Sequence, residues 1–246
     1  MHWSGPAIVC ATLPHGEAGA IVRLLTPDAG LLAGYVRGGG GRRTRPALIP
    51  GNRISARWHA RVESQLGHVT LELDQSAGPL MLGSRLSTAV LAWSTALTAH
   101  ALPERHPYPA LYDALAGLLT VMGATEDPRA WCAALVRYEL ILMSELGFGL
   151  DLSCCVATGA TDDLAFVSPK SSQAVSRAAG LPWADRMLPL PGFLARAGTH
   201  IAPWPEIADG LRLTGHFIER DILHGRVAES LEARQRLLRW IEAETR

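Results

Sequence analysis

The sequence predicts an α+β protein, in which a small amino-terminal barrel of five strands precedes a helical domain. From residue 6 to about residue 75, apolar residues alternate or form short runs between turn residues, a pattern typical of strands. Near Pro79 the apolar spacing changes from two to about 3.6 residues, which is typical of helices. With 246 residues, 48% of them apolar, the chain is long enough to bury a substantial core. We therefore expect a barrel domain over residues 1–78 and a helical domain over residues 79–246.

The first three strands are expected to be an opening strand and a hairpin. The opening strand covers about residues 6–12. Two apolar runs, residues 20–26 and 31–37, flank Pro27-Asp28-Ala29-Gly30, whose proline and glycine suit a tight turn. The two runs therefore predict an antiparallel pair.

The last two strands alternate between apolar and polar residues. In residues 52–61 the inward face carries Ile54, Ala56, Trp58 and Ala60, and the outward face carries Arg53, Ser55, Arg57, His59 and Arg61. In residues 68–74 the inward positions are Val69, Leu71 and Leu73. Five strands in such a short segment suit a small closed barrel of the oligonucleotide-binding (OB) type.

Helices are expected after the barrel. The first begins near Pro79 and carries Leu82, Leu86, Val90, Trp93 and Leu97 at helical spacing. The second begins at Pro109 and continues to Leu119. The third has Asp127 as its N-cap, Pro128 at its first position and Gly147 just past its end. Arg137 and Glu139 are expected on the surface of this third helix.

The carboxyl-terminal part is expected to contain an irregular segment and two further helices. Residues 150–200 are rich in Gly, Pro, Ser and Asp, and one short helix is expected near residues 171–179. The closing helices are expected at residues 204–224 and 227–244.

Positive charge is concentrated in one stretch although the formal net charge is zero. Residues 36–61 contain no acid and seven arginines, namely Arg37, Arg42, Arg43, Arg45, Arg53, Arg57 and Arg61. The glycine run at residues 38–41 predicts a mobile loop, and the strand beyond it places three of the arginines on one face. A basic loop and a basic face on one barrel predict a protein that contacts phosphates without reading bases.

Other interpretations of this stretch are open. The arginines can form a solvated face that protects an edge strand from aggregation, or a basic face that binds an acidic partner protein. Trp58 shares the parity of Ile54 and Ala56, so we expect it in the core rather than as a base-stacking platform. The glycine run is not a phosphate-binding loop of the P-loop type, because no Gly-Lys-Ser/Thr follows it.

The rest of the chain offers no convincing active site. The four cysteines make no spaced framework, which favours a reducing cytoplasmic compartment, and neither a signal peptide nor a membrane span is indicated. Scattered histidines and cysteines predict no bound metal. Cys154 and Cys155 lack a neighbouring histidine and are expected to pack in the interior. Asp162 and Asp163 are expected to cap or turn the backbone.

Four segments follow one another in a characteristic order: HGEAGAIVRLLTPDAGLLAGYVRGGGGRR, PGNRISARWHAR, LVRYELILMSELGFGLDL and CVATGATDDLAFVSPKSSQAVSRAAG. This order resembles the bacterial RecO family of DNA repair proteins, which are recombination mediators. The most specific parts are the glycine and basic segment after the second hairpin strand and the helix end at residues 137–149. The resemblance spans essentially the whole chain.

The resemblance implies an OB barrel, a helical bundle and a zinc-ribbon-like segment packed against the bundle. It also implies binding to single- and double-stranded DNA, annealing of complementary strands, and cooperation with RecR to place RecA on strands coated by single-stranded DNA-binding protein. Such proteins are not enzymes, and a nucleoid-associated location in the cytoplasm is expected.

The zinc-ribbon-like segment departs from the family pattern. Many members carry four zinc cysteines in the part that matches residues 151–180. Here Cys155 occupies one such place, Thr158 stands at the next, and VSPKSS offers no second pair. We therefore expect a metal-free segment and no cofactor, while a metal- or cysteine-dependent enzyme in residues 150–180 remains an alternative hypothesis.

The resemblance further implies that the helical domain binds the carboxyl-terminal tail of single-stranded DNA-binding protein. An apolar groove with a cation beside it is the chemistry that such an acidic, apolar tail requires. Arg137 is the candidate cation, and Arg85 and Arg129 also qualify.

Overall fold

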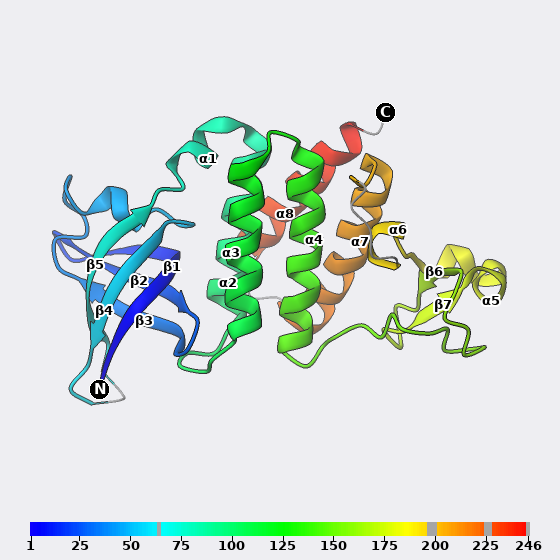
Figure 1. Ribbon diagram of the computed structural model, residues 1–246, viewed down its shortest axis with the longest axis horizontal. Helices are drawn as coiled ribbons and strands as arrows, with labels where there is room; N and C mark the ends of the chain where they lie inside the picture. The colour runs from blue at the N-terminus through cyan, green and yellow to red at the C-terminus, as the bar shows by residue number, and fades with distance from the viewer. Residues whose placement is uncertain (63–64, 196–200, 224–227, 245–246) are drawn as a thin grey trace. The chain divides into compact units, whose positions relative to one another are not determined.

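The computed structural model describes residues 1–62, 65–195, 201–223 and 228–244 (Figure 1). The chain forms two compact units, Met1–Gly123 and Ala124–Arg246. The first unit contains a β-barrel with three helices, and the second is mainly helical. The predicted α+β class is therefore confirmed.

The five predicted strands close into a barrel. Their bounds are β1 His2–His15, β2 Gly19–Thr26, β3 Gly30–Val36, β4 Arg53–His59 and β5 Gly67–Gln75. The order around the barrel is β1-β2-β3-β5-β4, and the predicted closed barrel of the OB type is confirmed. β1 begins earlier than predicted, because its first half pairs with β4 and its second half with β2.

Alternating side chains fill the barrel. Ile54, Ala56 and Trp58 point inward and are buried, as the period of the fourth strand predicts. The rest of this core comprises Ala7, Val9, Ala20, Val22, Leu24, Leu32, Val36, Leu48, Ala60 and Val69. The inward position predicted for Leu73 is wrong, because this side chain is 43% exposed. In the described chain, β3 pairs with β5 only near Gly67, so the far end of β5 lacks that neighbour.

Two glycines allow the barrel to close around Trp58. β3 and β5 pair through Gly34 and Gly67. A Cβ on Gly67 would lie 2.1 Å from Nε1 of Trp58, and a Cβ on Gly34 would lie 2.4 Å from Cγ2 of Val69. The indole Nε1 donates to the carbonyl of Ala33 at 2.8 Å. The core position predicted for Trp58 is confirmed, and its polar atom is satisfied.

Three helices follow the barrel in the first unit. They are α1 Gly78–Gly83, α2 Arg85–Ala101 and α3 Pro109–Ala124. The sequence predicted one helix where α1 and α2 stand. Ser84 separates the two, because its extended backbone and its hydroxyl start a capping box with Ser87. Leu82 therefore lies outside the apolar stripe of α2 and is 89% exposed.

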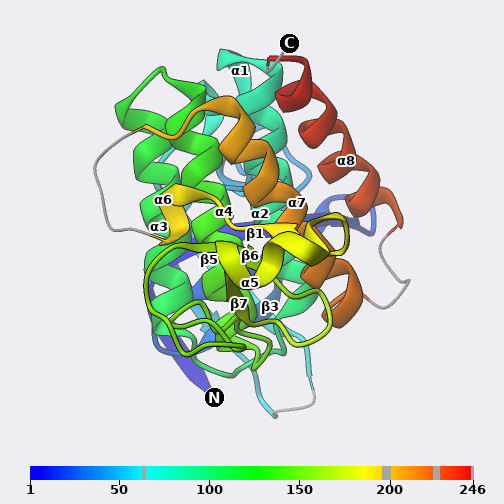
Figure 2. The ribbon, with the colours of Figure 1, turned by 90° about the vertical axis from the view of Figure 1, so that its right-hand side faces the viewer.

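The second unit packs long helices together. Its main helices are α4 Pro128–Glu145, α7 Trp204–Asp221 and α8 Ala228–Ala243, and α7 contacts both of the others (Figure 2). The boundaries predicted for α4 are confirmed: Asp127 accepts from the backbone N–H of Arg129 at 2.9 Å, and Gly147 has a φ of +85°.

The segment between α4 and α7 is irregular, as predicted, and holds a small sheet. The strands are β6 Leu164–Val167, β7 Ala174–Ser176 and β8 Leu188–Pro189, in the order β7-β6-β8. Short helices α5 Arg177–Gly180, η2 Leu181–Arg186 and α6 Gly192–Ala195 complete it. The helix predicted near residues 171–179 is wrong over β7, whose three residues are buried and pair with β6.

A buried ion pair links the helices of the second unit. Glu139 on α4 has no exposed surface, so its predicted surface position is wrong. The guanidinium of Arg234 on α8 donates to both Glu139 oxygens, at 3.0 and 2.9 Å, and Thr214 on α7 donates to the same carboxylate. Gly215 makes room for this guanidinium, because a Cβ there would lie 2.2 Å from Nη1 of Arg234.

Candidate nucleic-acid interface

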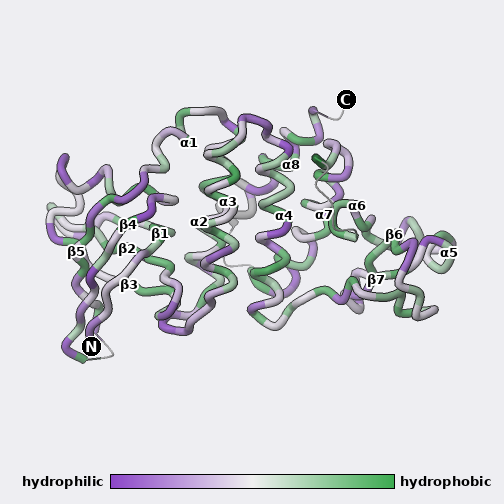
Figure 3. Tube along the Cα trace, viewed as in Figure 1, coloured by the Kyte–Doolittle hydropathy of each residue, from purple (hydrophilic) through white to green (hydrophobic). Residues whose placement is uncertain are grey.

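The arginines that follow the glycine run lie in the loop between β3 and β4. Arg37, Arg42, Arg43 and Arg45 are all exposed. The loop consists of successive turns: Gly41 N–H donates to Gly38 O at 2.9 Å, and Arg45 N–H donates to Gly41 O at 2.9 Å. A short helix, η1 Arg45–Leu48, ends the loop. Figure 3 shows hydrophilic colouring along the loop between β3 and β4 of the first unit.

This loop is attached to the turn between β1 and β2. Gly40 N–H donates to Ala18 O at 3.1 Å. Gly39 is buried, and a Cβ there would lie 2.7 Å from Cβ of Ala20. The glycines therefore hold the loop close to the barrel while its guanidinium groups remain in solvent.

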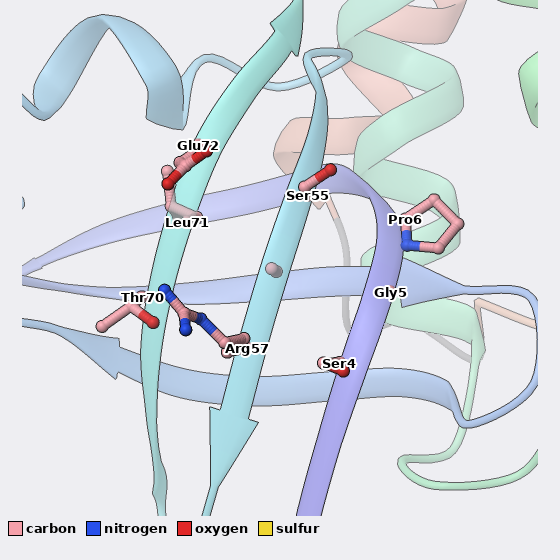
Figure 4. A pocket seen from close by; sticks show the side chains of 9 residues that line it. Ser4, Gly5, Pro6, Ser55, Arg57, Thr70, Leu71 and Glu72 are labelled. Carbon is pink, nitrogen blue, oxygen red and sulfur yellow. The ribbon is translucent and has the colours of Figure 1, made fainter.

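The outer face of β4 carries the next arginine. Ser55, Arg57 and His59 are exposed, as the alternation predicts, and Arg61 is exposed just beyond the strand. Arg57 lines a shallow hollow of about 390 Å³ over β1, β4 and β5. Its side chain extends from β4 toward Thr70 on β5 (Figure 4). Ser4, Ser55 and Glu72 are other polar residues in the lining.

Carboxylates of β5 lie on the same outer face. Glu72 lines the hollow together with Arg57, and Ser55 Oγ donates to Asp74 Oδ2 at 2.8 Å. Residues 36–61 contain no acid, but strand pairing places these two acids beside β4. Among the described residues, no carboxylate forms an ion pair with any of the six exposed arginines. The positive charge of these arginines is therefore available to an anionic ligand.

Arg53 does not join this exposed set. The sequence predicts it on one face with Arg57 and Arg61, but its side chain is half-buried and is directed to α3. Its Nη2 donates to the carbonyl of Ala116 at 2.5 Å and to Oγ1 of Thr120 at 2.7 Å. A helix carbonyl and a hydroxyl thus occupy the N–H groups of Nη2 and direct this guanidinium toward α3.

Replacing Arg53 by alanine is expected to lower the free energy of unfolding by about 1–3 kcal/mol, because a charged donor to α3 is lost. The dependence of DNA affinity on salt should stay unchanged. Arg57→Ala is the matched variant on the same strand. It should leave stability within about 0.5 kcal/mol and reduce the salt slope by about 0.7 on single strands. Urea unfolding measures the change in stability, and salt titrations of DNA binding measure the slope. An equal slope change in both variants would contradict the assignment of Arg53 to α3 and of Arg57 to DNA.

Arg137, the candidate for partner binding, is exposed on α4. Its guanidinium lies 5.3 Å from the ring centroid of Phe193, and Nη2 donates to Phe193 O at 3.4 Å. Arg129 instead pairs with Asp127 at 2.8 Å, and Arg85 is exposed at the start of α2. A cation next to an aromatic ring suits an acidic, apolar peptide, so Arg137 stays the preferred candidate of the three.

The two cysteines of the irregular segment differ in environment. Cys155 is buried as expected, whereas Cys154 is half-buried. Burial of the Cys155 thiol raises its pKa, but hydrogen bonds from the hydroxyl and amide of Ser176, the hydroxyl of Thr158 and the amide of Ala157 outweigh this effect and lower the pKa to about 6.

In the described ranges no three His, Cys, Asp or Glu side chains come together as a metal site.

The low pKa of Cys155 makes the second unit sensitive to pH. Because the pKa is lowered on folding, the thiolate stabilises the fold fully above the ordinary thiol pKa, and this contribution is lost as pH falls toward 6. Absorbance at 240 nm should report a thiolate that titrates near pH 6 and disappears in Cys155→Ala. Cys132→Ala is the control, because burial raises the pKa of that thiol to about 12. A titration near pH 6 that persists in Cys155→Ala would contradict the assignment.

Asp163 turns the backbone as predicted. It has a positive φ of 45°, its carbonyl accepts from Arg177 N–H at 2.9 Å, and its carboxylate pairs with Arg177 at 3.1 Å.

Family models match both parts of the chain. The model described as "Recombination protein O N terminal" matches residues 1–76, and the one described as "Recombination protein O C terminal" matches residues 83–229. The chain belongs to the RecO family. The DNA repair protein RecO of Rhodospirillum rubrum is 44% identical, with 99% of both chains covered. That of Methylobacterium nodulans is 44% identical with 96% of both chains covered, and that of Caulobacter vibrioides strain NA1000 is 46% identical with 89% of both covered.

Membership in the RecO family assigns the chain a role in DNA repair and recombination. The amino-terminal RecO match coincides with the barrel, which bears the exposed arginines.

The boundary predicted between residues 78 and 79 stays a prediction, since the compact units of the structure divide at residues 123 and 124. No helix in the described part of this RecO-family chain is long and apolar enough to cross a membrane.

Sequence reasoning did not single out four rings on the same barrel, those of His15, Tyr35, His59 and His68. The alternation of the fourth strand placed His59 outward, but it gave no information about its neighbours. The four come together only through strand pairing, which joins residues that are far apart in the sequence.

Proposed function

We propose that this chain is a non-enzymatic recombination mediator that binds the sugar-phosphate backbone of single- and double-stranded DNA through its barrel. The observation that supports this most directly is the set of six exposed arginines without ion-pair partners in the described structure: Arg37, Arg42, Arg43, Arg45, Arg57 and Arg61. Arginine is a strong donor to phosphate oxygens. Most of these residues belong to a loop, which suits contacts with the backbone rather than the reading of bases.

Annealing follows from the same electrostatics. Guanidinium groups that cover phosphates reduce the repulsion between two strands and raise their local concentration, so base pairing itself can supply the specificity. Such a protein needs no covalent step.

The proposal includes the partners implied by the RecO family. The chain would act with RecR in the cytoplasm, associated with the nucleoid, to place RecA on strands coated by single-stranded DNA-binding protein. The tail of that protein would bind the helical domain at Arg137, where a cation lies over the Phe193 ring.

A fluorescence-anisotropy titration of the full chain tests the proposal. Labelled single-stranded and duplex oligonucleotides would be titrated between low and moderate salt. With about four phosphate contacts, log affinity should fall with log salt with a slope of about −3 for single strands and about −4 for duplex. Absence of binding to either form at low salt would refute the proposal. Binding to RecR with no DNA affinity would instead favour a protein-interaction scaffold.

A further inference from the structure

A continuous row of aromatic rings lies on the outside of the barrel. The rings of His59 and His68 are stacked, with centroids 5.4 Å apart and planes at 21°. His68 contacts Tyr35 edge to face at 5.9 Å, and Tyr35 contacts His15 edge to face at 5.9 Å. The aromatic row, defined as His15, Tyr35, His68 and His59, thus joins four rings through three contacts.

Strand pairing creates this row. His59 lies opposite His68 across β4 and β5, and His68 lies opposite Tyr35 across β5 and β3. His15 ends β1, next to the turn into β2. The row therefore runs from the β1–β2 turn, across β3 and β5, to the connection between β4 and β5. On an OB barrel these two connections flank the surface that can receive an oligonucleotide.

The backbone of β2 holds the Tyr35 ring in place. A Cβ on Gly19 would lie 2.3 Å from Cε2 of Tyr35 and 2.4 Å from its hydroxyl oxygen. The ring therefore lies directly against the glycine. His15, His59 and His68 are exposed and Tyr35 is half-buried, so the row keeps ring surface in contact with solvent.

One cation lies at the His59 end of the row, and a second follows Tyr35 along the chain. Arg61 lines a hollow of about 480 Å³ together with His59, Gln65, Leu66 and His68. Arg37 follows Tyr35 by two residues and is exposed. One carboxylate, Glu17, lies in the turn beside His15. Aromatic faces together with guanidinium groups are the combination that binds single-stranded nucleic acid, because bases stack while phosphates pair with cations.

We propose that the aromatic row is a base-stacking platform for single-stranded DNA, with Arg61 and Arg37 receiving the adjacent phosphates. The inference rests on the proposed function and adds to it a difference between the two kinds of DNA. Bases in a duplex already stack on one another, so only unpaired bases can use the row. Since every base has an aromatic face, the platform tolerates any sequence.

The test compares three ligands of equal length on the full chain: single-stranded oligo-dT, an abasic single strand, and a duplex. The wild type should bind oligo-dT about tenfold more tightly than the abasic strand, which carries the same phosphates without bases. His59→Ala combined with His68→Ala should lower affinity for oligo-dT about tenfold and leave the other two affinities unchanged. The control His100→Ala removes an exposed imidazole from α2 in the same unit and should change none of the three.

Two further variants protect the test against a folding defect. His59→Phe combined with His68→Phe keeps the rings and removes the imidazole nitrogens, so it should retain the preference for oligo-dT. Gly19→Ala keeps every ring but forces the Tyr35 ring from its place, so it should weaken oligo-dT binding alone. Equal losses on all three ligands in the alanine variant would show that the histidines do not act by stacking on bases and would overturn the inference.

The outcomes also separate this inference from the proposed function. If the wild type binds oligo-dT and the abasic strand equally, the platform is refuted while backbone binding stands. If it binds neither strand nor the duplex, the proposed function fails as well.

Discussion

Reversing Arg42, Arg43 and Arg45 to glutamate is expected to weaken binding to single-stranded and duplex DNA at least about a hundredfold at low salt, and to abolish annealing. All three side chains are exposed and have no ion-pair partner in the described structure. Each lost phosphate contact should also reduce the salt slope by about 0.7 for single strands and about 0.9 for duplex. Anisotropy titrations at several salt concentrations measure affinity and slope together.

A matched triple reversal separates local contacts from net charge. Arg186, Arg236 and Arg239 are exposed arginines in the second unit, and their reversal to glutamate changes the net charge by the same amount. At about 0.15 M salt this control should lower DNA affinity less than about threefold, because repulsion between exposed charges more than about 8 Å apart is largely screened. If both triple variants lose affinity equally, the loop has no special role. If the loop variant loses a protein partner but keeps DNA affinity, the scaffold alternative is favoured.

Replacing Glu139 by alanine is expected to destabilise the second unit by about 3–5 kcal/mol. Glu139 has no exposed surface, and the side chain of Arg234 is 7% exposed. Removing the carboxylate would break the buried ion pair from one side, and removing one partner of such a pair typically costs about 3–5 kcal/mol. Urea unfolding followed by circular dichroism should show the loss as a lower transition midpoint.

Two controls define this effect. Glu145→Ala removes an exposed carboxylate from the end of the same helix and should change stability by less than about 0.5 kcal/mol. Glu139→Leu combined with Arg234→Met removes both charges and should recover most of the loss, because apolar pairs of similar size often replace buried ion pairs without cost. Thr214 would remain satisfied through the carbonyl of Gly210 at 3.0 Å. A double variant as unstable as Glu139→Ala would contradict the explanation by a one-sided loss of the ion pair.

Strand periodicity was the most informative local signal. The alternation over residues 52–61 predicted the inward position of Trp58 and the outward position of Arg57, and both are confirmed. Side chains alternate along any strand, so this property can be read from neighbouring residues alone. The helix capped by Asp127 was predictable for the same reason, since a cap is made within one turn.

The same local pattern did not predict the position of a side chain whose surroundings depend on an element far away in the sequence. Arg53 has the parity of Arg57, but α3 supplies a carbonyl and a hydroxyl for its guanidinium. Glu139 has the spacing of a surface residue, but its partner Arg234 follows 95 residues later. Leu73 has the parity of Val69, but β3 no longer pairs with β5 at that point.

The sequence by itself determined that a strand barrel precedes helices and that seven arginines and no acid occupy residues 36–61, since these features follow from the order of residues and from the period of each element. Only the tertiary structure decided which of those arginines face solvent, that Glu72 and Asp74 lie beside β4, and that four rings from separate strands form one row. The physical reason is that charge and ring contacts depend on distances between atoms. Strand register and helix packing set those distances for residues that are remote in the chain.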